Sequence, residues 1–526
     1  MSNRREILRI GFLSGITGGV FVILLMLLLR YFVGVPTLAE LILDCATPFL
    51  PIPIFFGMLR AVRGYNHLKE LGVISTLLAI IACFGVAGMG YALMVERARL
   101  RNLSSAISSS QYRSGIRFLL LLLAITWSLS IVLLWPALGA NYIGLSPARA
   151  FVLNPLSLLL IFVVGGIILV AMHRMLADQR TEEASGTSLR NRRTIVSAAV
   201  CGAGVLAVGA MLRRFYSFAA YAYDGKDTNG IYLPPITPNK DFYDVTKNSV
   251  DPRPDQSLWR VEIVGPVTTP KTYRIEEIRA MPSITQETTL ACISNGVGGH
   301  LMSNAIWKGV PLQQLIQAAG PNPDVIQVVF HGADAYSDDI SVELAMRPTT
   351  LLAYEMNGVP LPMHHGFPLR VIVPGMVGEK SIKWLTRIEL RDRAAKQFYE
   401  RQGWGPKFEI NTSSRFDGLD SHKPLDLGAP VDLHGIAFGG ARGVRSVEVS
   451  TDGGATWNPA EIVYRGSPMA WVQWKYEWRP DEPGVRHLVV RAVDGTGALQ
   501  SEIDKPAGPG PASGYHRVTV TVGKSS

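Results

Sequence analysis

The hydrophobic residues of this chain are concentrated in its first 215 positions, where they form long runs. Five runs stand out, at roughly 10–33, 72–95, 117–139, 151–172 and 194–212. A helix needs about 20 consecutive apolar residues to cross the hydrocarbon core of a bilayer. Each run approaches or exceeds that length. We therefore predict five membrane-spanning helices and a lipid bilayer as one partner of the protein.

A sixth apolar run, at 37–58, differs from the other five. It contains Glu40 and Asp44, and three prolines follow between positions 48 and 53. An ionised carboxylate is costly in the middle of a bilayer, and proline interrupts the hydrogen bonds of a helix. We therefore expect this segment to be re-entrant or to lie at the membrane interface.

The second half of the chain has the shorter patterns of a globular protein. Residues 259–263 alternate as a strand does, and 311–319, followed by Gly320, have the pattern of a short capped helix. From about 425, strand-like stretches such as 446–450 and 516–522 alternate with turn clusters. This spacing is typical of a small antiparallel sandwich.

These patterns divide the 526 residues into four parts. We expect an N-terminal α-helical transmembrane domain over 1–212 and a tether or wrapping segment over 213–258. An α+β domain follows over 259–414, and an immunoglobulin-like β-sandwich covers 415–526.

The formal net charge of +9 is unevenly distributed along the chain. Residues 1–215 hold 20 Lys and Arg against 8 Asp and Glu, whereas the remainder holds 31 basic and 34 acidic residues. The excess therefore belongs to the membrane half, where basic residues collect in cytoplasmic loops. This location argues against nucleic acid as a partner. With five spans it predicts a bacterial cytoplasmic membrane protein whose second half lies on the extracytoplasmic, periplasmic side.

The last apolar run is preceded by an arginine pair. Arg192 and Arg193 stand before a mild stretch that is rich in Ala and Gly. This arrangement is similar to a twin-arginine export signal. The alternative is that both residues are ordinary cytoplasmic charges.

Cys292 is the single cysteine of the second half, since Cys45, Cys83 and Cys201 lie in hydrophobic segments. A lone thiol of this kind is a buried apolar residue, a nucleophile or a metal ligand. The spans offer no histidine pair and the chain has no Cys-x-x-Cys-His motif. We therefore expect no haem bound by this chain.

Three segments gather residues that can hold a charged cofactor: 289–310 around Cys292, 352–370 with His365 and Arg370, and 373–384 with Lys383. In order and distance they resemble the molybdopterin-binding core of the sulfite oxidase family, over roughly 235–400. The tail at 415–523 resembles the dimerisation domain of the same family, including the run 450–457. The resemblance implies a sulfite-oxidase-like molybdopterin domain and a possible homodimer.

The resemblance also implies a set of site residues. Cys292 is then the ligand of molybdenum in a molybdenum-molybdopterin cofactor, and a thiolate is a soft ligand that suits such a metal. The positions that match pterin contacts begin near 245 and are Lys247, Asn248, Asp334, His365, Arg370, Ser381 and Lys383.

Around the metal the chain departs from the sulfite-oxidising pattern of arginines and one tyrosine. Arg517 matches one arginine, whereas Lys247 and Val297 stand in the places of two others and Trp404 in that of the tyrosine. We expect Arg517, Lys247 and Trp404 around the mouth of the pocket. Losing bidentate donors weakens binding of a dianion, so a neutral or singly charged ligand is favoured.

The sequence thus predicts an enzyme that carries out two-electron oxygen-atom transfer on a small oxyanion or S-oxide, or on a nitrogen analogue. Because the chain carries no haem domain, a separate electron-transfer partner is expected. Two alternatives remain. One is a thiol hydrolase that uses Cys292 with His300, and the other is a membrane-tethered, non-catalytic β-rich binding module.

Overall fold

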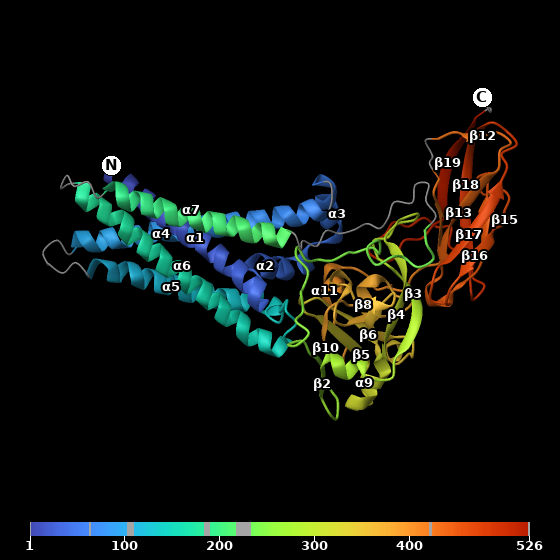
Figure 1. Ribbon diagram of the computed structural model, residues 1–526, viewed down its shortest axis with the longest axis horizontal. Coiled ribbons are helices and arrows are strands. Elements are labelled where there is room, and N and C mark those ends of the chain that lie inside the picture. The colour runs from blue at the N-terminus through green and yellow to red at the C-terminus, as the bar shows by residue number, and fades with distance from the viewer. Residues whose placement is uncertain are drawn as a thin grey trace.

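The computed structural model describes residues 2–62, 65–101, 110–183, 190–216, 233–419 and 423–523. The molecule is elongated, with a helical bundle at one end, a mixed α and β part in the middle and a β unit at the other end (Figure 1). This order along the long axis follows the order along the chain.

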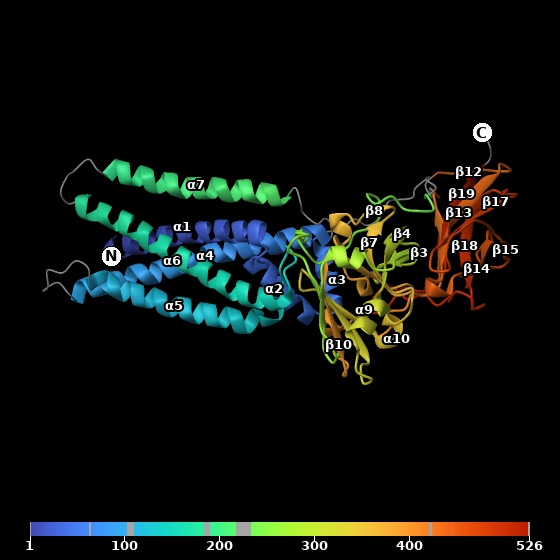
Figure 2. The ribbon, with the colours of Figure 1, turned by 60° about the horizontal axis from the view of Figure 1, so that its bottom comes forward.

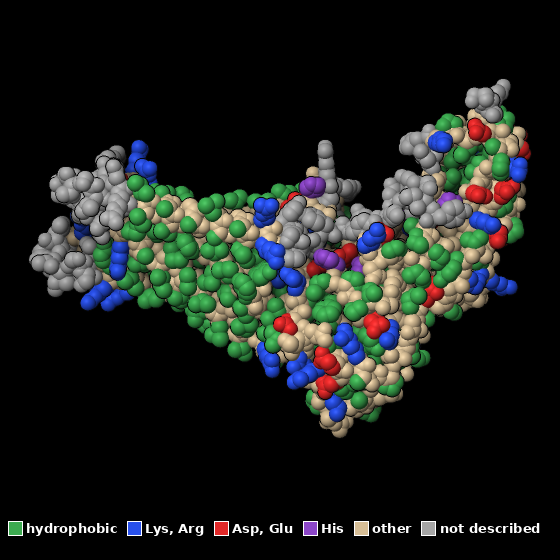
Figure 3. All heavy atoms as spheres, in the orientation of Figure 1, with side chains coloured by type: hydrophobic (Ala, Val, Ile, Leu, Met, Phe, Trp, Pro, Cys, Tyr) green, Lys and Arg blue, Asp and Glu red, His purple; other side chains and the backbone are tan. Residues whose placement is uncertain are grey.

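The bundle contains five long helices: α1 (Ser2–Val33), α4 (Tyr65–Arg101), α5 (Ser110–Leu134), α6 (Pro147–Glu183) and α7 (Arg190–Tyr216). Each contains a stretch that is long and apolar enough to cross a membrane, at the five places where the sequence predicts a span. On the face shown in Figure 3, hydrophobic side chains cover the bundle between its ends, and Lys and Arg gather at both ends. The five helices are therefore compatible with membrane anchoring.

Glycines determine how closely α1 and α4 pack. A side chain at Gly15 would collide with the backbone of Phe84, and one at Gly88 would collide with the backbone of Gly11. Small residues let two membrane helices approach to backbone contact, where van der Waals packing holds them.

The segment after α1 forms short helical pieces. They are α2 (Leu38–Ala46), η1 (Thr47–Phe49) and α3 (Ile52–Ala61), which are too short to cross a membrane. Thr37 and Glu40 form a capping box that starts α2, and Arg30 of α1 lies 3.0 Å from Glu40. This ion pair explains how a buried carboxylate is tolerated here.

The middle part contains two sheets. The first has the order β2-β1-β10-β5-β6, and its pair β1 with β10 is parallel. Its strands are β1 (Val261–Val264), β2 (Lys271–Tyr273), β5 (Gln327–Gly332), β6 (Ser337–Ser341) and β10 (Leu385–Arg391). The second sheet has the order β3-β4-β7-β8, with β9 paired to β7. Its strands are β3 (Ile284–Ala291), β4 (Met302–Pro311), β7 (Leu351–Met356), β8 (Val359–Pro360) and β9 (Arg370–Ile372).

Short helices lie in the connections between these strands. They are α8 (Ile275–Arg279), α9 (Leu312–Ala319), α10 (Val342–Ala345), α11 (Phe398–Gln402), η3 (Met363–His365) and η4 (Gly378–Lys380). Helix α9 ends at Gly320, whose φ of 64° lies in the left-handed region, as the capped-helix pattern predicts. Its buried Leu315 and Ile316 join Phe330 and Ile388 in the core of this part.

The C-terminal part is built from two further sheets (Figure 2). One has the order β11-β13-β17-β16 and the other β12-β19-β18-β14-β15. Their strands are β11 (Ser413–Asp417), β12 (Leu425–Asp426), β13 (Val431–Phe438), β14 (Val444–Ser450), β15 (Asn458–Pro459), β16 (Glu461–Arg465), β17 (Val472–Trp478), β18 (Gly484–Asp494) and β19 (His516–Gly523). A short 3-10 turn, η5 (Gly440–Arg442), connects β13 to β14. Leu433 and Trp474 of one sheet share a buried core with Val447 and Leu488 of the other.

The loops of the bundle are bonded to the middle part. The backbone N–H of Asn141 donates to the carbonyl of Ala333 at 2.8 Å, and that of Arg253 donates to the carbonyl of Tyr142 at 2.8 Å. Arg30 donates to the carbonyl of Val250 at 2.9 Å. These contacts fix the orientation of the bundle against the part that carries the candidate site.

Candidate functional site

A cavity of about 380 Å³ lies where the middle part meets the bundle. Its lining comes from 242–247, the end of β3 and the residues after it, the stretch 378–384, and α3 with the start of α4. Single residues from other segments complete it, among them Asp334, Arg370 and Trp404. The cavity contains most of the residues singled out in the sequence. They are Cys292, Lys247, Asp334, His365, Arg370, Ser381, Lys383 and Trp404.

Cys292 directly follows β3 and is held by its backbone. Its N–H donates to the carbonyl of Leu301 at 2.9 Å, and its sulfur lies 3.1 Å from the hydroxyl of Ser294. Burial, helped by the nearby carboxyl of Glu379, raises the pKa of the thiol to about 12. Deprotonation at neutral pH therefore needs a strong electrophile such as a metal ion to replace the proton.

Arg370 and His365 form the polar floor of the cavity. Arg370 is buried and donates to the carbonyls of His365 and Ser381 at 2.9 and 3.0 Å. Its Nε is buried and has no hydrogen-bond partner among the described residues. Burial lowers the pKa of His365 to about 4, so at neutral pH its Nε2 donates to the carbonyl of Asn239 at 2.7 Å as an uncharged ring.

Both lysines of the cavity are already paired with carboxylates. Lys383 lies 2.6 Å from Asp244, and Lys247 lies 2.5 Å from Asp44 of α2. Burial by itself would lower the pKa of Lys247, but Asp44 and Asp334 hold it above its ordinary value. Each lysine of the cavity is thus compensated by a carboxylate.

Asn248 lies beside the cavity. Its amide donates to the carboxylate of Asp334 at 2.9 Å, and Asp334 itself lines the cavity. Trp404 is 7% exposed and donates its indole N–H to Gln402 at 3.0 Å. Its ring therefore presents an apolar wall to the cavity.

Arg517 does not reach this cavity, which corrects the expected arrangement. On β19 its side chain is half exposed and lies 2.9 Å from Glu502. The preceding His516 points inward, where its Nδ1 accepts the N–H of Phe416 at 3.0 Å. Successive side chains of a strand point to opposite faces, so an inward His516 turns Arg517 outward.

Val297 lies in a second and much smaller cavity. This cavity measures about 40 Å³, also touches Cys292, and is bordered by Arg415 and the stretch 511–514. Val297 is 37% exposed. The structure thus places it near the cysteine but on the side of the C-terminal part, away from Lys247 and Trp404.

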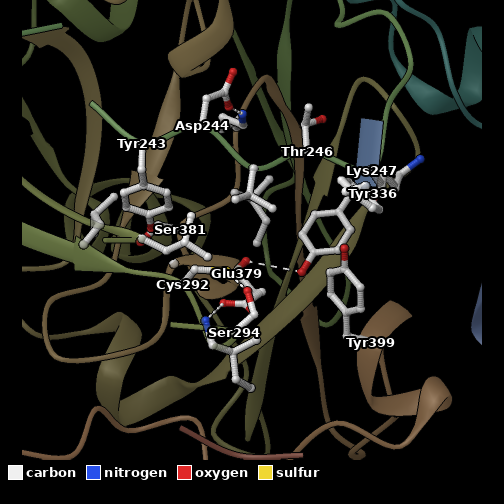
Figure 4. A pocket seen from close by; sticks show the side chains of 18 of the residues that line it. Tyr243, Asp244, Thr246, Lys247, Cys292, Ser294, Tyr336, Glu379, Ser381 and Tyr399 are labelled. Carbon is white, nitrogen blue, oxygen red and sulfur yellow. Dashed lines mark hydrogen bonds and ion pairs between the residues drawn. The ribbon is translucent and has the colours of Figure 1, made fainter. Parts of the chain in front are cut away.

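Several lining residues were not anticipated from the sequence. Glu379 accepts the N–H of Ile293 at 3.3 Å, and burial raises its pKa to about 8. Figure 4 shows Glu379 between Cys292 and two tyrosines, Tyr336 and Tyr399. A carboxylate placed directly after Gly378, at the end of an apolar run, was the available signal. Phe55, Phe56 and Tyr65 come from the membrane half and carried no such signal.

The residues present suit an anionic cofactor with a thiophilic metal. A soft sulfur ligand stands at one side of the cavity, while Arg370 offers a buried N–H that no described residue uses. A guanidinium binds phosphate oxygens well because its donors form a rigid fork.

Comparison with known proteins agrees with this chemistry. Residues 248–399 match the oxidoreductase molybdopterin binding domain, and residues 409–522 match the Mo-co oxidoreductase dimerisation domain. The mitochondrial sulfite oxidase of Mus musculus is 32% identical over 320 residues, which cover 52% of this chain and 58% of that protein. The inducible NADH nitrate reductase 2 of Glycine max is 30% identical, over 49% of this chain and 36% of that protein. The chain thus spans between about a third and three fifths of the length of these relatives.

A solved structure shares the fold. The sulfane dehydrogenase SoxCD from Paracoccus pantotrophus superposes with a TM-score of 0.51 at 24% sequence identity, covering 56% of this chain and 85% of that chain. The sulfite-oxidase-like fold expected from the sequence is therefore confirmed for the molybdopterin-binding part.

Proposed function

Because this chain belongs to the sulfite oxidase family of molybdopterin-dependent oxidoreductases, we propose that the cavity holds a molybdenum-molybdopterin cofactor with Cys292 as the protein ligand of the metal. Arg370, Ser381 and Lys383 would hold its anionic and polar groups, with the neutral ring of His365 beside them. When bound, the cofactor supplies a two-electron centre that exchanges an oxygen atom with the substrate.

The proposed reaction is oxygen-atom transfer on a small sulfur or nitrogen oxo compound. Reduction of an S-oxide consumes two electrons and two protons and yields a sulfide and water. The electrons would come from a separate electron-transfer partner. Oxidation of sulfite to sulfate is the reverse kind of transfer and delivers two electrons to that partner.

The charge balance of the cavity supports a neutral or singly charged substrate. Its two lysines are paired with Asp44 and Asp244, and Arg517 lies elsewhere. Among the described lining residues, a dianion would find no unpaired fork of the kind that binds oxyanions strongly, apart from the donors that the cofactor itself would use.

The remaining features are proposed with this function. The helices of 1–212 anchor the protein in a bacterial cytoplasmic membrane, with the catalytic part on the periplasmic side. Segment 213–258, of which 217–232 lie outside the described residues, joins them to the molybdopterin-binding part over 259–414. An immunoglobulin-like unit over 415–526 provides the contact for a homodimer.

The test uses full-length protein purified from membranes. We expect about one molybdenum per chain by elemental analysis. With dye electron carriers, kcat/KM for an organic sulfoxide should exceed that for sulfite roughly tenfold or more, which corresponds to about 1.4 kcal/mol. A metal-free protein from a host that makes the cofactor would overturn the cofactor assignment. Efficient sulfite oxidation would overturn the substrate assignment alone.

A further inference from the structure

The membrane half of the protein forms part of the catalytic cavity. Phe55 and Phe56 of α3 and Tyr65 at the start of α4 line the same space as Cys292. The two phenylalanines belong to the connection between the first two membrane helices, and Tyr65 is the first residue of the second. Figure 1 shows α2 and α3 at the end of the bundle that faces the middle part. The cavity is therefore closed on one side by residues that precede the cofactor-binding part by some 200 positions.

The apolar contact between the two halves is made by aromatic rings. The rings of Phe56 and Trp404, one from each half, lie 6.0 Å apart between centroids. Within the membrane half, Phe55 meets Tyr65 edge to face at 6.1 Å. Ile52 and Phe56 also pack against the buried cluster that contains Trp404. Aromatic pairs at such distances add to the stability gained from burying their area.

The polar contact is the ion pair between Asp44 and Lys247. Both side chains are almost fully buried, with 13% and 7% exposure, and their charged atoms are 2.5 Å apart. Leaving either charge buried without its partner is strongly unfavourable. Helix α2 is in turn held to α1 by Arg30, which bonds both Glu40 and the carbonyl of Val250. An ion pair and aromatic contacts thus hold the segment against the cavity together.

We propose that the segment α2 to α3, residues 38–61, is a fixed cover of the catalytic cavity that selects its ligands. Asp44 cancels the charge of the one lysine that faces the cavity from the tether, and Phe55 and Phe56 provide an aromatic wall. The ligand class that fits is a neutral S-oxide or N-oxide bearing an apolar or aromatic substituent. The identity of this ligand rests on the proposed function, whereas the docking of the cover does not.

Hydrogen–deuterium exchange of the holoenzyme in lipid nanodiscs tests the docking. Asp44→Asn should make backbone amides of 38–61 exchange at least about fivefold faster, because local opening becomes easier when the pair is lost. Asp44→Glu should restore most of the protection. Glu70→Gln, at an exposed carboxylate of α4, is the matched control and should leave the segment unchanged. Equal protection of 38–61 in wild type and Asp44→Asn would overturn the docking by this pair.

Steady-state kinetics with methyl phenyl sulfoxide and dimethyl sulfoxide test the selection. Phe56→Ala should raise KM for the phenyl compound by about tenfold relative to the dimethyl compound, with little change in kcat, because it removes uniform binding of the ring. Phe49→Ala, at a residue of the same segment that is 85% exposed, should not alter the ratio. An unchanged ratio in Phe56→Ala overturns the selection. A wild-type enzyme that turns over no S-oxide overturns both the ligand class and the proposed substrate, while the exchange measurement still decides the docking.

Discussion

The ammonium group of Lys247 lies 2.5 Å from a carboxylate oxygen of Asp44, although 203 positions separate the two residues along the chain. Lys247 belongs to the tether that enters the cofactor-binding part, and Asp44 belongs to helix α2 of the membrane half. Through this pair, the membrane anchor and the catalytic cavity form one continuous structure.

Removing the ammonium group of Lys247 should destabilise the folded protein strongly, because its buried partner Asp44 remains. Lys247→Met leaves Asp44 buried without a partner, at an expected cost of about 3–5 kcal/mol. The double variant Lys247→Met with Asp44→Leu replaces the pair by apolar groups and should recover at least half of that loss. Thermal unfolding in detergent measures both. Additive losses in the double variant would contradict the coupling.

The role of Cys292 can be separated from cofactor retention. Cys292→Ser should abolish turnover, because a hydroxyl is a poor ligand for a thiophilic metal, while the pterin stays largely bound through Arg370 and its neighbours. Pterin fluorescence after acid release measures the content, and dye reduction measures the turnover. Cys201→Ser, in helix α7, is the control. Near-full activity of Cys292→Ser would rule out the assigned ligand.

Two arginines should behave in opposite ways. Arg517→Ala should change kcat/KM by less than about twofold, because exposed ion pairs contribute little and this one is far from the cavity. Arg370→Ala should instead lose most of the bound cofactor, because it deletes a buried guanidinium from the cavity floor. Molybdenum content and kinetics distinguish the two. A large catalytic defect in Arg517→Ala would restore the placement expected from the sequence.

Acid should weaken the C-terminal part through His516. Burial lowers the pKa of His516 to about 4, whereas an unfolded histidine titrates near 6.5. The unfolded chain then binds more protons between these values, so the stabilisation is complete above about pH 6.5 and is lost as the pH falls to about 4. The contribution is up to about 3 kcal/mol. In His516→Gln the melting temperature should depend less on pH over this range than in the wild type. His487→Gln, at an exposed site, should keep the pH dependence of the wild type.

Export of the catalytic part should depend on the arginine pair before the last span. The pair lies in the first turn of α7, and its side chains are outside the described residues. Arg192→Lys with Arg193→Lys should retain the second half in the cytoplasm if the twin-arginine route is used. A reporter fused after Ser526 and protease accessibility measure this. An accessibility pattern identical to that of the wild type would exclude this route.

Local properties of the sequence determined the outline of the molecule. The length of an apolar run decides whether a helix can span a bilayer, and all five predicted runs lie in long apolar helices. Gly320 ends α9 because a left-handed residue is needed there. The prolines after Asp44 explain why 37–58 is broken into short helices. Likewise, the isolation of Cys292 in the second half reduced its possible roles to three before any fold was known.

Only the tertiary structure decided which of these residues share a cavity. His516 and Arg517 are adjacent in sequence, but the strand sends them to opposite faces, and the sequence does not state which one turns inward. The sequence offers no reason for a carboxylate at position 44 of an apolar segment, and the reason is the ion pair with a lysine 203 positions away. A contact of this kind depends on how whole elements pack, because the energy that places them comes from the summed burial of many side chains and not from the two residues that finally meet.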